Sequence, residues 1–248
     1  MLDDLKYIHE RDAQDALGIA EKQWQQLEHA FTVQIKPENI SNIVFAGMGG
    51  SALGALISQS WPMYKVPFEI CRNYQIPAYV GRDTLFVASS YSGNTEETLS
   101  ALEAAEAKQA QIVVIASGGR LRAIAEEKGY PFELLPEAGQ PRFAALYGLK
   151  ALVTILESAG LVEVDKAEKK LKDAAKFLKV HTANWTPIVP AKNNLAKQVA
   201  LECMGKSPVI YAGPRLFPAA YKWKISFNEN AKNVAWCNAY PEFNHNEM

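Results

Sequence analysis

Three aliphatic hydroxyl side chains fall within one stretch of six residues, Ser90-Tyr91-Ser92-Gly93-Asn94-Thr95. An apolar run precedes the stretch and an amphipathic pattern follows it, so we expect the hydroxyls in a turn between a strand and a helix. The first N–H groups of a helix have no intrahelical acceptor, and hydroxyls can donate further hydrogen bonds. The same residue types would also suit an ordinary helix N-cap. The clustering nevertheless predicts an anion site, in which geometry matters as much as charge because the stretch contains no Lys or Arg.

A second turn of this kind is Gly47-Met48-Gly49-Gly50-Ser51, which follows the apolar run 42–46. Glycines there let the backbone approach a ligand closely. The spacing from Gly47 to Ala52 also fits the dinucleotide pattern G-x-G-x-x-A, with Glu69 where a ribose-binding acid would be expected. A nucleotide site is the less favoured alternative, because it requires neither the Ser51 hydroxyl nor a second anion-binding turn.

Short apolar segments alternate with helical patterns over the first 160 residues. We expect strands at 42–46, 66–70, 85–89, 111–116 and 132–135, and helices at 13–31, 52–57, 95–108, 121–128 and 140–158. This alternation predicts an α/β fold with a doubly wound parallel sheet and helices on both faces. Ligands of such sheets bind beyond the carboxyl ends of the strands, where the connection order reverses, so the two turns are expected to share one site.

A charged helix at 166–179 is expected to connect this part to a second one, with one apolar side formed by Ala167, Leu171, Ala174, Ala175 and Leu178. Helix 193–204, strand 208–212, helix 216–232 and strand 234–237 then weakly repeat the first arrangement. These elements are too few for a full doubly wound layer. We therefore expect a first domain at 1–160, a connecting helix and linker at 161–190, and a partial second domain at 191–248.

Composition excludes several classes of partner. The 248 residues carry 26 basic and 27 acidic side chains in an interspersed pattern, which argues against a nucleic-acid groove or an anionic membrane surface. With 48% hydrophobic residues the chain can bury a substantial core. The N-terminus contains no apolar signal core, and no apolar run approaches membrane-spanning length, so a cytoplasmic protein with a small-molecule ligand is expected.

The cysteines and histidines lack the spacing of a disulfide framework or a metal site. They are Cys71, Cys203, Cys237, His9, His29, His181 and His245. We expect no metal and no other cofactor.

At its two turns the chain resembles a sugar isomerase (SIS) domain, a flavodoxin-like fold that binds phosphosugars through a Ser/Thr-rich loop. Five stretches taken together resemble the motifs of the bifunctional phosphoglucose/phosphomannose isomerase family, in that family's order. These are Gly47–Ser51, Ser90–Thr98, Gln140–Arg142, Asn228–Asn230 and the run Pro241-Glu242-Phe243-Asn244-His245-Asn246-Glu247. The serine loop marks only the SIS class, whereas the last run makes the resemblance specific.

The resemblance implies a role for each matching residue. The phosphate would be held by Gly50, Ser51, Ser90, Ser92 and Thr95. Arg142 would face the reacting end of the sugar, Glu229 would be the catalytic base, and His245 would assist ring opening. The family's subunits pair as dimers, with this His supplied by the neighbouring chain. Its members continue beyond the last motif, completing a second SIS subdomain and adding a catalytic-site Lys, so residues 191–248 are expected to form an incomplete one.

Converting an aldose phosphate to a ketose phosphate moves a proton between C1 and C2 through an enediol, which requires a carboxylate that takes and returns it. Glu229 is the favoured base, and Glu202 and Glu242 remain competitors. His245 suits ring opening because His exchanges protons readily near neutral pH, and Arg142 could stabilise the charge of an enediolate. A catalytically inactive phosphosugar-binding SIS module remains an alternative to the isomerase.

Overall fold

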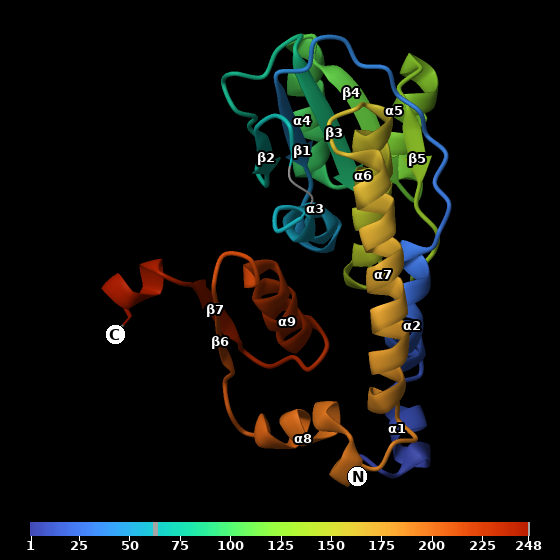
Figure 1. Cartoon of the computed structure of the whole chain (residues 1–248), viewed down its shortest axis with the longest axis vertical. Helices are drawn as coiled ribbons and strands as arrows, with labels where there is room; N and C mark the ends of the chain where they lie inside the picture. The colour runs from blue at the N-terminus through green and yellow to red at the C-terminus, as the bar shows by residue number, and fades with distance from the viewer. Residues whose placement is uncertain (62–63, 248) are drawn as a thin grey trace. The chain divides into compact units, whose positions relative to one another are not determined.

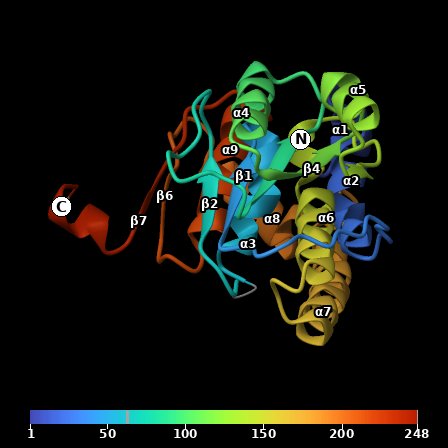
Figure 2. The ribbon, with the colours of Figure 1, turned by 90° about the horizontal axis from the view of Figure 1, so that it is seen from above.

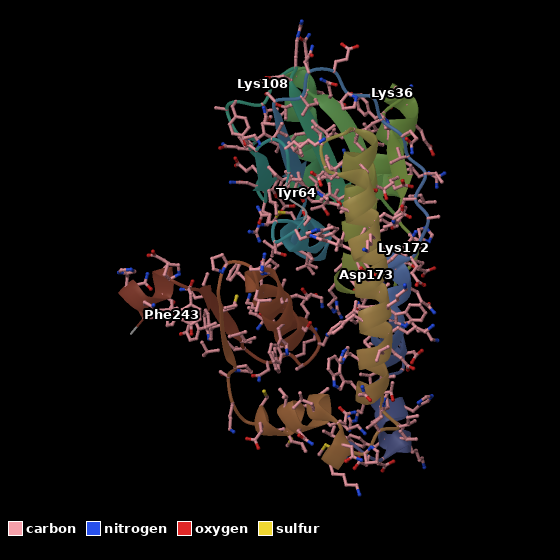
Figure 3. The ribbon with its side chains drawn as sticks, viewed as in Figure 1. Lys36, Tyr64, Lys108, Lys172, Asp173 and Phe243 are labelled. Atoms are coloured by element: carbon pink, nitrogen blue, oxygen red, sulfur yellow. The ribbon has the colours of Figure 1, made fainter. Side chains whose placement is uncertain are left out.

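The computed structural model describes residues 1–61 and 64–247, which form two compact units. One unit comprises residues 26–172, and the other comprises residues 1–25 together with 173–248. The boundary between Lys172 and Asp173 falls inside a continuous helix (Figure 3). The N-terminal 25 residues thus group with the C-terminal segment, while the division into domains at 1–160, 161–190 and 191–248 remains a prediction.

A five-stranded parallel sheet forms the centre of the 26–172 unit (Figure 1). Its strands are β1 (Asn42–Ala46), β2 (Phe68–Cys71), β3 (Thr84–Ser90), β4 (Gln111–Ala116) and β5 (Phe132–Leu134). Their spatial order is β2-β1-β3-β4-β5. The predicted doubly wound α/β fold is therefore confirmed, with the order of flavodoxin-like sheets and a reversal between β1 and β3.

Helices cover both faces of this sheet, as Figure 2 shows. On one face lie α4 (Glu96–Ala107) and α5 (Gly119–Lys128), and on the other lie α3 (Leu53–Ser58) and α6 (Ala145–Ser158). The apolar core under α4 and α5 takes alternate residues of the central strands, including Val44, Phe86 and Val114. The intervening residues are equally buried, which explains why these strands are continuous apolar runs rather than alternating ones.

The expected N-terminal helix at 13–31 is wrong in its bounds. The chain instead forms α1 (Leu5–Arg11), α2 (Ala16–Lys22) and a 3₁₀ turn, η1 (Gln23–Leu27). The break has a local cause, because the Asp12 carboxylate accepts from the N–H groups of Ala16 and Leu17 at 2.8 Å each. Asp15 adopts a left-handed conformation with φ 52° and caps α2. Side-chain capping therefore separates α2 from an unpredicted helix, α1, and starts α2 at Ala16 rather than at residue 13.

The connecting helix α7 (Val164–Thr182) is longer than the predicted 166–179. Ala167, Leu171 and Ala175 are buried on its apolar side and Leu178 is half-buried, but Ala174 is exposed. Every helix in the described part of the chain is too short or too polar to cross a membrane.

The second unit contains a small parallel sheet of β6 (Val209–Ala212) and β7 (Trp236–Ala239), with α9 (Phe217–Glu229) between them in the chain. Helix α8 (Leu195–Glu202) precedes β6, and short 3₁₀ turns lie at η4 (Ala183–Trp185), η5 (Ala191–Asn193) and η6 (Glu242–His245). The strand predicted at 208–212 is confirmed as β6, whereas the one predicted at 234–237 begins two residues later, at Trp236. The predicted helix at 216–232 ends earlier, at Glu229.

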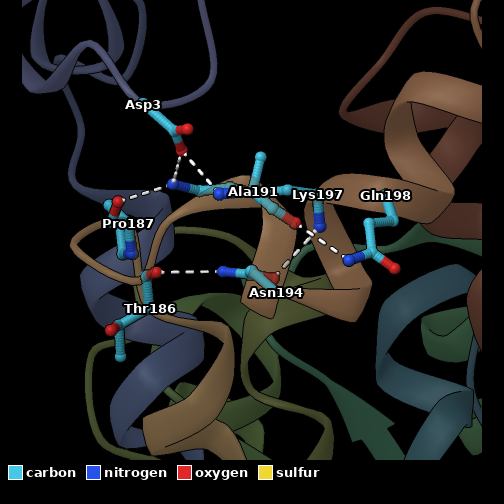
Figure 4. Close-up of polar contacts among 7 residues, drawn as sticks. All are labelled: Asp3, Thr186, Pro187, Ala191, Asn194, Lys197 and Gln198. Atoms are coloured by element: carbon cyan, nitrogen blue, oxygen red, sulfur yellow. Dashed lines mark hydrogen bonds and ion pairs between the residues drawn. The ribbon is translucent and has the colours of Figure 1, made fainter.

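A polar cluster around the buried Asn194 joins the N-terminal segment to the start of α8 (Figure 4). The Lys197 ammonium lies 2.9 Å from the Asp3 carboxylate and donates to the Pro187 carbonyl at 2.7 Å. The fully buried Asn194 accepts from the Lys197 N–H and donates to the Thr186 carbonyl. These contacts explain why residues 1–25 group with the C-terminal segment rather than with the five-stranded sheet.

We predict that Gly54→Ala destabilises the protein, because a Cβ at this position would lie 2.5 Å from the backbone nitrogen of Leu149 on α6. Forcing the two helices apart should lower the free energy of unfolding by about 1–3 kcal/mol. Gly148→Ala is the matched control, since the nearest atom to its Cβ would be the Cα of Gly54 at 4.0 Å. Urea unfolding of the three proteins measures the difference, and equal stabilities of the two variants would contradict this packing.

Candidate functional site

The two predicted anion-binding turns lie next to each other at the carboxyl edge of the five-stranded sheet. Strands β1 and β3 are paired in register, with Ala46 opposite Ala88, so Gly47 and Ser90 emerge at the same edge. A hydrogen bond joins the turns directly, because the Tyr91 N–H donates to the Ser51 hydroxyl at 2.8 Å. The turns thus flank the point where the strand order reverses, which is where such sheets bind ligands.

The hydroxyls of the serine loop differ in their surroundings. Ser90 is only 1% exposed, and its Oγ accepts from the Gly93 N–H at 3.1 Å and lies 2.7 Å from the Thr95 hydroxyl. Ser92 is exposed, and its Oγ accepts from the Asn94 N–H at 3.3 Å. Ser90 therefore shapes the loop from inside, whereas Ser92 presents a hydroxyl at its surface.

Thr95 stands at the N-cap position of α4, but its side chain makes no capping hydrogen bond. Its hydroxyl faces Ser90 instead. The first-turn N–H groups of a helix have no intrahelical acceptor, and the helix dipole adds positive potential there. In an ordinary N-cap the side chain accepts a hydrogen bond from these N–H groups. Here they are left without that acceptor and can donate to an anion instead.

A third turn, Ser117–Gly119 after β4, closes on the serine loop, and our sequence analysis missed it. Gly93 and Gly119 have φ angles of 70° and 67°. A Cβ on Gly93 would lie 1.8 Å from the Gly118 carbonyl oxygen, and one on Gly119 would lie 2.2 Å from that of Ser92. Only glycine fits at both places. The signal in the sequence was a Ser-Gly-Gly run directly after an apolar strand.

Arg142 lies in the 3₁₀ turn η3 (Pro141–Phe143), whose backbone lies against the glycine turn. A Cβ on Gly50 would be 2.7 Å from the Arg142 backbone nitrogen, so this close approach requires glycine. The guanidinium is half-buried, packs over the Phe143 ring at 4.8 Å and makes a long hydrogen bond of 3.5 Å with Gln140. The backbone of Arg142 thus lies directly against Gly50, one of the predicted phosphate-binding residues.

One compact unit brings together most of the predicted site residues: Gly50, Ser51, Ser90, Ser92, Thr95 and Arg142. Glu229 and His245 belong to the other unit. Glu229 is the half-buried last residue of α9, and its carbonyl accepts from the Lys232 ammonium at 2.8 Å. His245 is exposed at the end of η6.

The C-terminal motif folds back on β6 and β7. Phe243, labelled in Figure 3, is buried and stacks on Tyr211 with ring centroids 4.3 Å apart. The Glu247 carboxylate accepts from the Tyr211 hydroxyl at 2.7 Å and from the Asn238 amide. These two hydrogen bonds hold the pKa of Glu247 below its usual value. The turn that carries His245 is therefore anchored on both sides.

The competing carboxylates have more exposed surroundings. Glu202 is exposed and lies 3.4 Å from the Lys206 ammonium, and Glu242 is exposed and accepts from the Asn246 amide at 3.2 Å. Glu69, the candidate ribose-binding acid, accepts from the Tyr79 hydroxyl at 2.5 Å. Within residues 1–61 and 64–247, no group of three His, Cys, Asp or Glu side chains could hold a metal ion.

The family model described as the bacterial phospho-glucose isomerase C-terminal SIS domain matches residues 192–248. Among solved structures, the C-terminal domain of glucosamine-fructose-6-phosphate aminotransferase from Francisella tularensis is similar, with a TM-score of 0.66. That match covers 94% of this chain and 70% of the other, at 15% identity. At such low identity the likeness shows the fold alone.

Sequence relatives carry the comparison further. A bifunctional phosphoglucose/phosphomannose isomerase of Caldicellulosiruptor bescii is 38% identical over 220 residues, which are 88% of this chain and 64% of the relative. A D-glucosamine-6-phosphate 4-epimerase of Sulfolobus acidocaldarius is 36% identical over 83% of this chain and 62% of its own length. The chain therefore spans slightly less than two thirds of these relatives. Over most of its length the chain is thus a homologue of bifunctional phosphoglucose/phosphomannose isomerases, and its C-terminal part matches an isomerase SIS domain.

Proposed function

We propose that this protein is an aldose-ketose isomerase that interconverts glucose 6-phosphate and mannose 6-phosphate with fructose 6-phosphate. The observation that carries the proposal is the junction of the glycine turn, the serine loop and Arg142 at the reversal point of the sheet. Similarity to these isomerases favours this hypothesis over a nucleotide-binding protein and over a phosphosugar-binding module without catalysis.

In this proposal the phosphate binds between the turns. Ser92 and the first N–H groups of α4 donate to it, Gly50 and Ser51 form the opposite wall, and Ser90 with Thr95 keeps the loop in shape. A dianion held by many neutral donors exchanges readily, whereas several Lys or Arg side chains would hold it more tightly. Turnover of a metabolite requires such reversible binding.

The proposed chemistry uses one base and two assisting groups. The Glu229 carboxylate removes the proton from C2 of the open-chain aldose, which gives the enediol, and returns it to C1 while the O2 hydroxyl proton passes to O1, which leaves the carbonyl of the ketose at C2. The Arg142 guanidinium stabilises negative charge on the enediol oxygens, and His245 transfers the proton that opens the sugar ring. We propose that no metal or other cofactor takes part.

We also propose that subunits pair as homodimers, with His245 of each chain serving the site of its partner, and that the protein acts in the cytoplasm. An exposed His at the end of a short turn, anchored by Phe243 and Glu247, is suited to reach a neighbouring chain. A C₂ dimer would build two equivalent sites in this way.

Ser92→Ala should raise the KM for each sugar phosphate about ten- to hundredfold, because one hydrogen bond to a charged group is lost. The melting temperature should stay unchanged, since Ser92 is exposed. Ser100→Ala on the following helix α4, whose hydroxyl donates to the Tyr74 carbonyl, is the matched control and should leave KM unaltered. Steady-state kinetics of the wild type and both variants measure these KM values. Equal KM values for the two variants would contradict the phosphate site.

Glu229→Gln should lower kcat about 10²- to 10⁴-fold with little change in KM, because the amide preserves the shape but cannot accept the proton. The assay follows fructose 6-phosphate formed by the 248-residue chain from glucose 6-phosphate and from mannose 6-phosphate separately. Glu202→Gln and Glu242→Gln should retain activity, and loss of activity in either would transfer the role of base to that residue.

Two further outcomes of this assay would overturn the proposal. Sugar-phosphate binding by thermal shift without any turnover would favour the phosphosugar-binding module. Conversion of glucosamine 6-phosphate at C4 in place of isomerisation would favour the reaction named for the Sulfolobus relative.

Mixing Glu229→Gln chains with His245→Ala chains should restore about a quarter of the wild-type activity. About half of the dimers would be mixed, and each mixed dimer would hold one site with both residues intact if His245 acts across the interface. The mixture is measured after dissociation and reassociation, with each variant alone as its control. No recovery in dimers shown to be mixed would place both residues in the site of a single chain.

A further inference from the structure

Tyr91 contacts the turns that follow three other strands of the sheet. Its N–H donates to the Ser51 hydroxyl after β1 at 2.8 Å, and its carbonyl accepts from the Ser117 N–H after β4 at 3.0 Å. Its hydroxyl oxygen accepts from the Ala138 N–H, in the segment after β5, at 2.6 Å. One residue in the middle of the serine loop therefore links it to every neighbouring turn of the proposed site.

The segment held by the Tyr91 hydroxyl leads directly to Arg142. Leu135 still bonds to β4 through its N–H, and Gln140 closes a tight turn onto the Ala138 carbonyl at 2.7 Å. The chain then enters the turn Pro141–Phe143, whose backbone lies against Gly50. Ala138 is only 7% exposed, so bulk water is a poor alternative acceptor for its N–H. The hydroxyl of Tyr91 is the acceptor that holds this segment in place.

The backbone and the side chain of Tyr91 thus hold different segments of the chain. Its backbone joins the serine loop to Ser51 whatever side chain is present, while only its hydroxyl reaches Ala138. We propose that Tyr91 is a positioning residue whose hydroxyl sets the place of Arg142 relative to the bound phosphate. This inference rests on the proposed isomerase function, in which Arg142 stabilises the negative charge that develops on the enediol oxygens.

Loss of the hydroxyl leaves a buried N–H without its acceptor, and the segment 136–142 must shift or loosen to satisfy it. The phosphate-binding turns keep their backbone contacts. A small misplacement of a group that acts in the transition state lowers kcat more than it weakens ground-state binding. Tyr91 therefore differs in its expected effect from the residues that touch the phosphate.

Tyr91→Phe tests the inference, with Tyr130→Phe as the matched control. The Tyr130 hydroxyl is hydrogen-bonded to Glu106 at 2.8 Å just before β5, at the opposite edge of the sheet. We expect Tyr91→Phe to lower kcat roughly ten- to hundredfold while KM changes less than about threefold. Stabilisation by inorganic phosphate in a thermal-shift titration should keep its wild-type midpoint. Tyr130→Phe should leave all three quantities unchanged.

Hydrogen exchange separates failure of this inference from failure of the proposed function. In Tyr91→Phe the amides of 137–140 and of Arg142 should exchange faster, with and without phosphate, while those of 84–95 keep their protection. A wild-type chain without turnover would refute the proposed isomerase, and the exchange result would then decide the role of Tyr91. Unchanged exchange at 137–140 and Arg142, unchanged kcat, or a parallel loss of phosphate binding would each overturn the positioning role.

Discussion

The close approach of three turns at one edge of a parallel sheet is the constraint on which the candidate site depends. Parallel pairing of β1, β3 and β4 brings their carboxyl ends together, and each strand continues into a turn with a serine. The turns can meet only where side chains are absent, which is why Gly50, Gly93 and Gly119 face backbone atoms at distances that no Cβ could tolerate. The backbone N–H groups and hydroxyls gathered in this way are of the kind that hydrogen-bond to a phosphate.

The arrangement of the hydroxyls follows from this packing. Thr95 could cap its own helix, as its position would suggest, but the buried Ser90 lies within 2.7 Å and takes up its hydroxyl. Polar groups inside the loop thereby satisfy one another, while the helix start remains available. The loop is ordered by its own hydrogen bonds before any ligand arrives, and preorganisation of this kind reduces the entropy that binding must overcome.

In the second unit, side-chain contacts rather than close approaches of the backbone hold the candidate residues in place. Here a two-stranded sheet is extended by aromatic stacking of Phe243 on Tyr211 and by the hydrogen bonds of Glu247. A sheet of two strands is marginal by itself, so side-chain contacts of this kind contribute much of the order of the motif that carries His245. Glu229 obtains its place from α9, where it is the last helical residue and half-buried.

Short-range patterns in the sequence determined the order of strands, turns and helices, because apolar periodicity and turn residues act over a few neighbouring positions. They also identified the hydroxyls of the serine loop and the glycine turn, although they missed α1 and the capping by Asp12 that sets the start of α2. Only the tertiary structure decided that Arg142 lies beside Gly50, that Ser117–Gly119 closes the site, and that Tyr91 holds Ala138. These contacts join residues far apart in the chain. They depend on strand order and on the distances at which backbones meet, which local residue preferences do not encode.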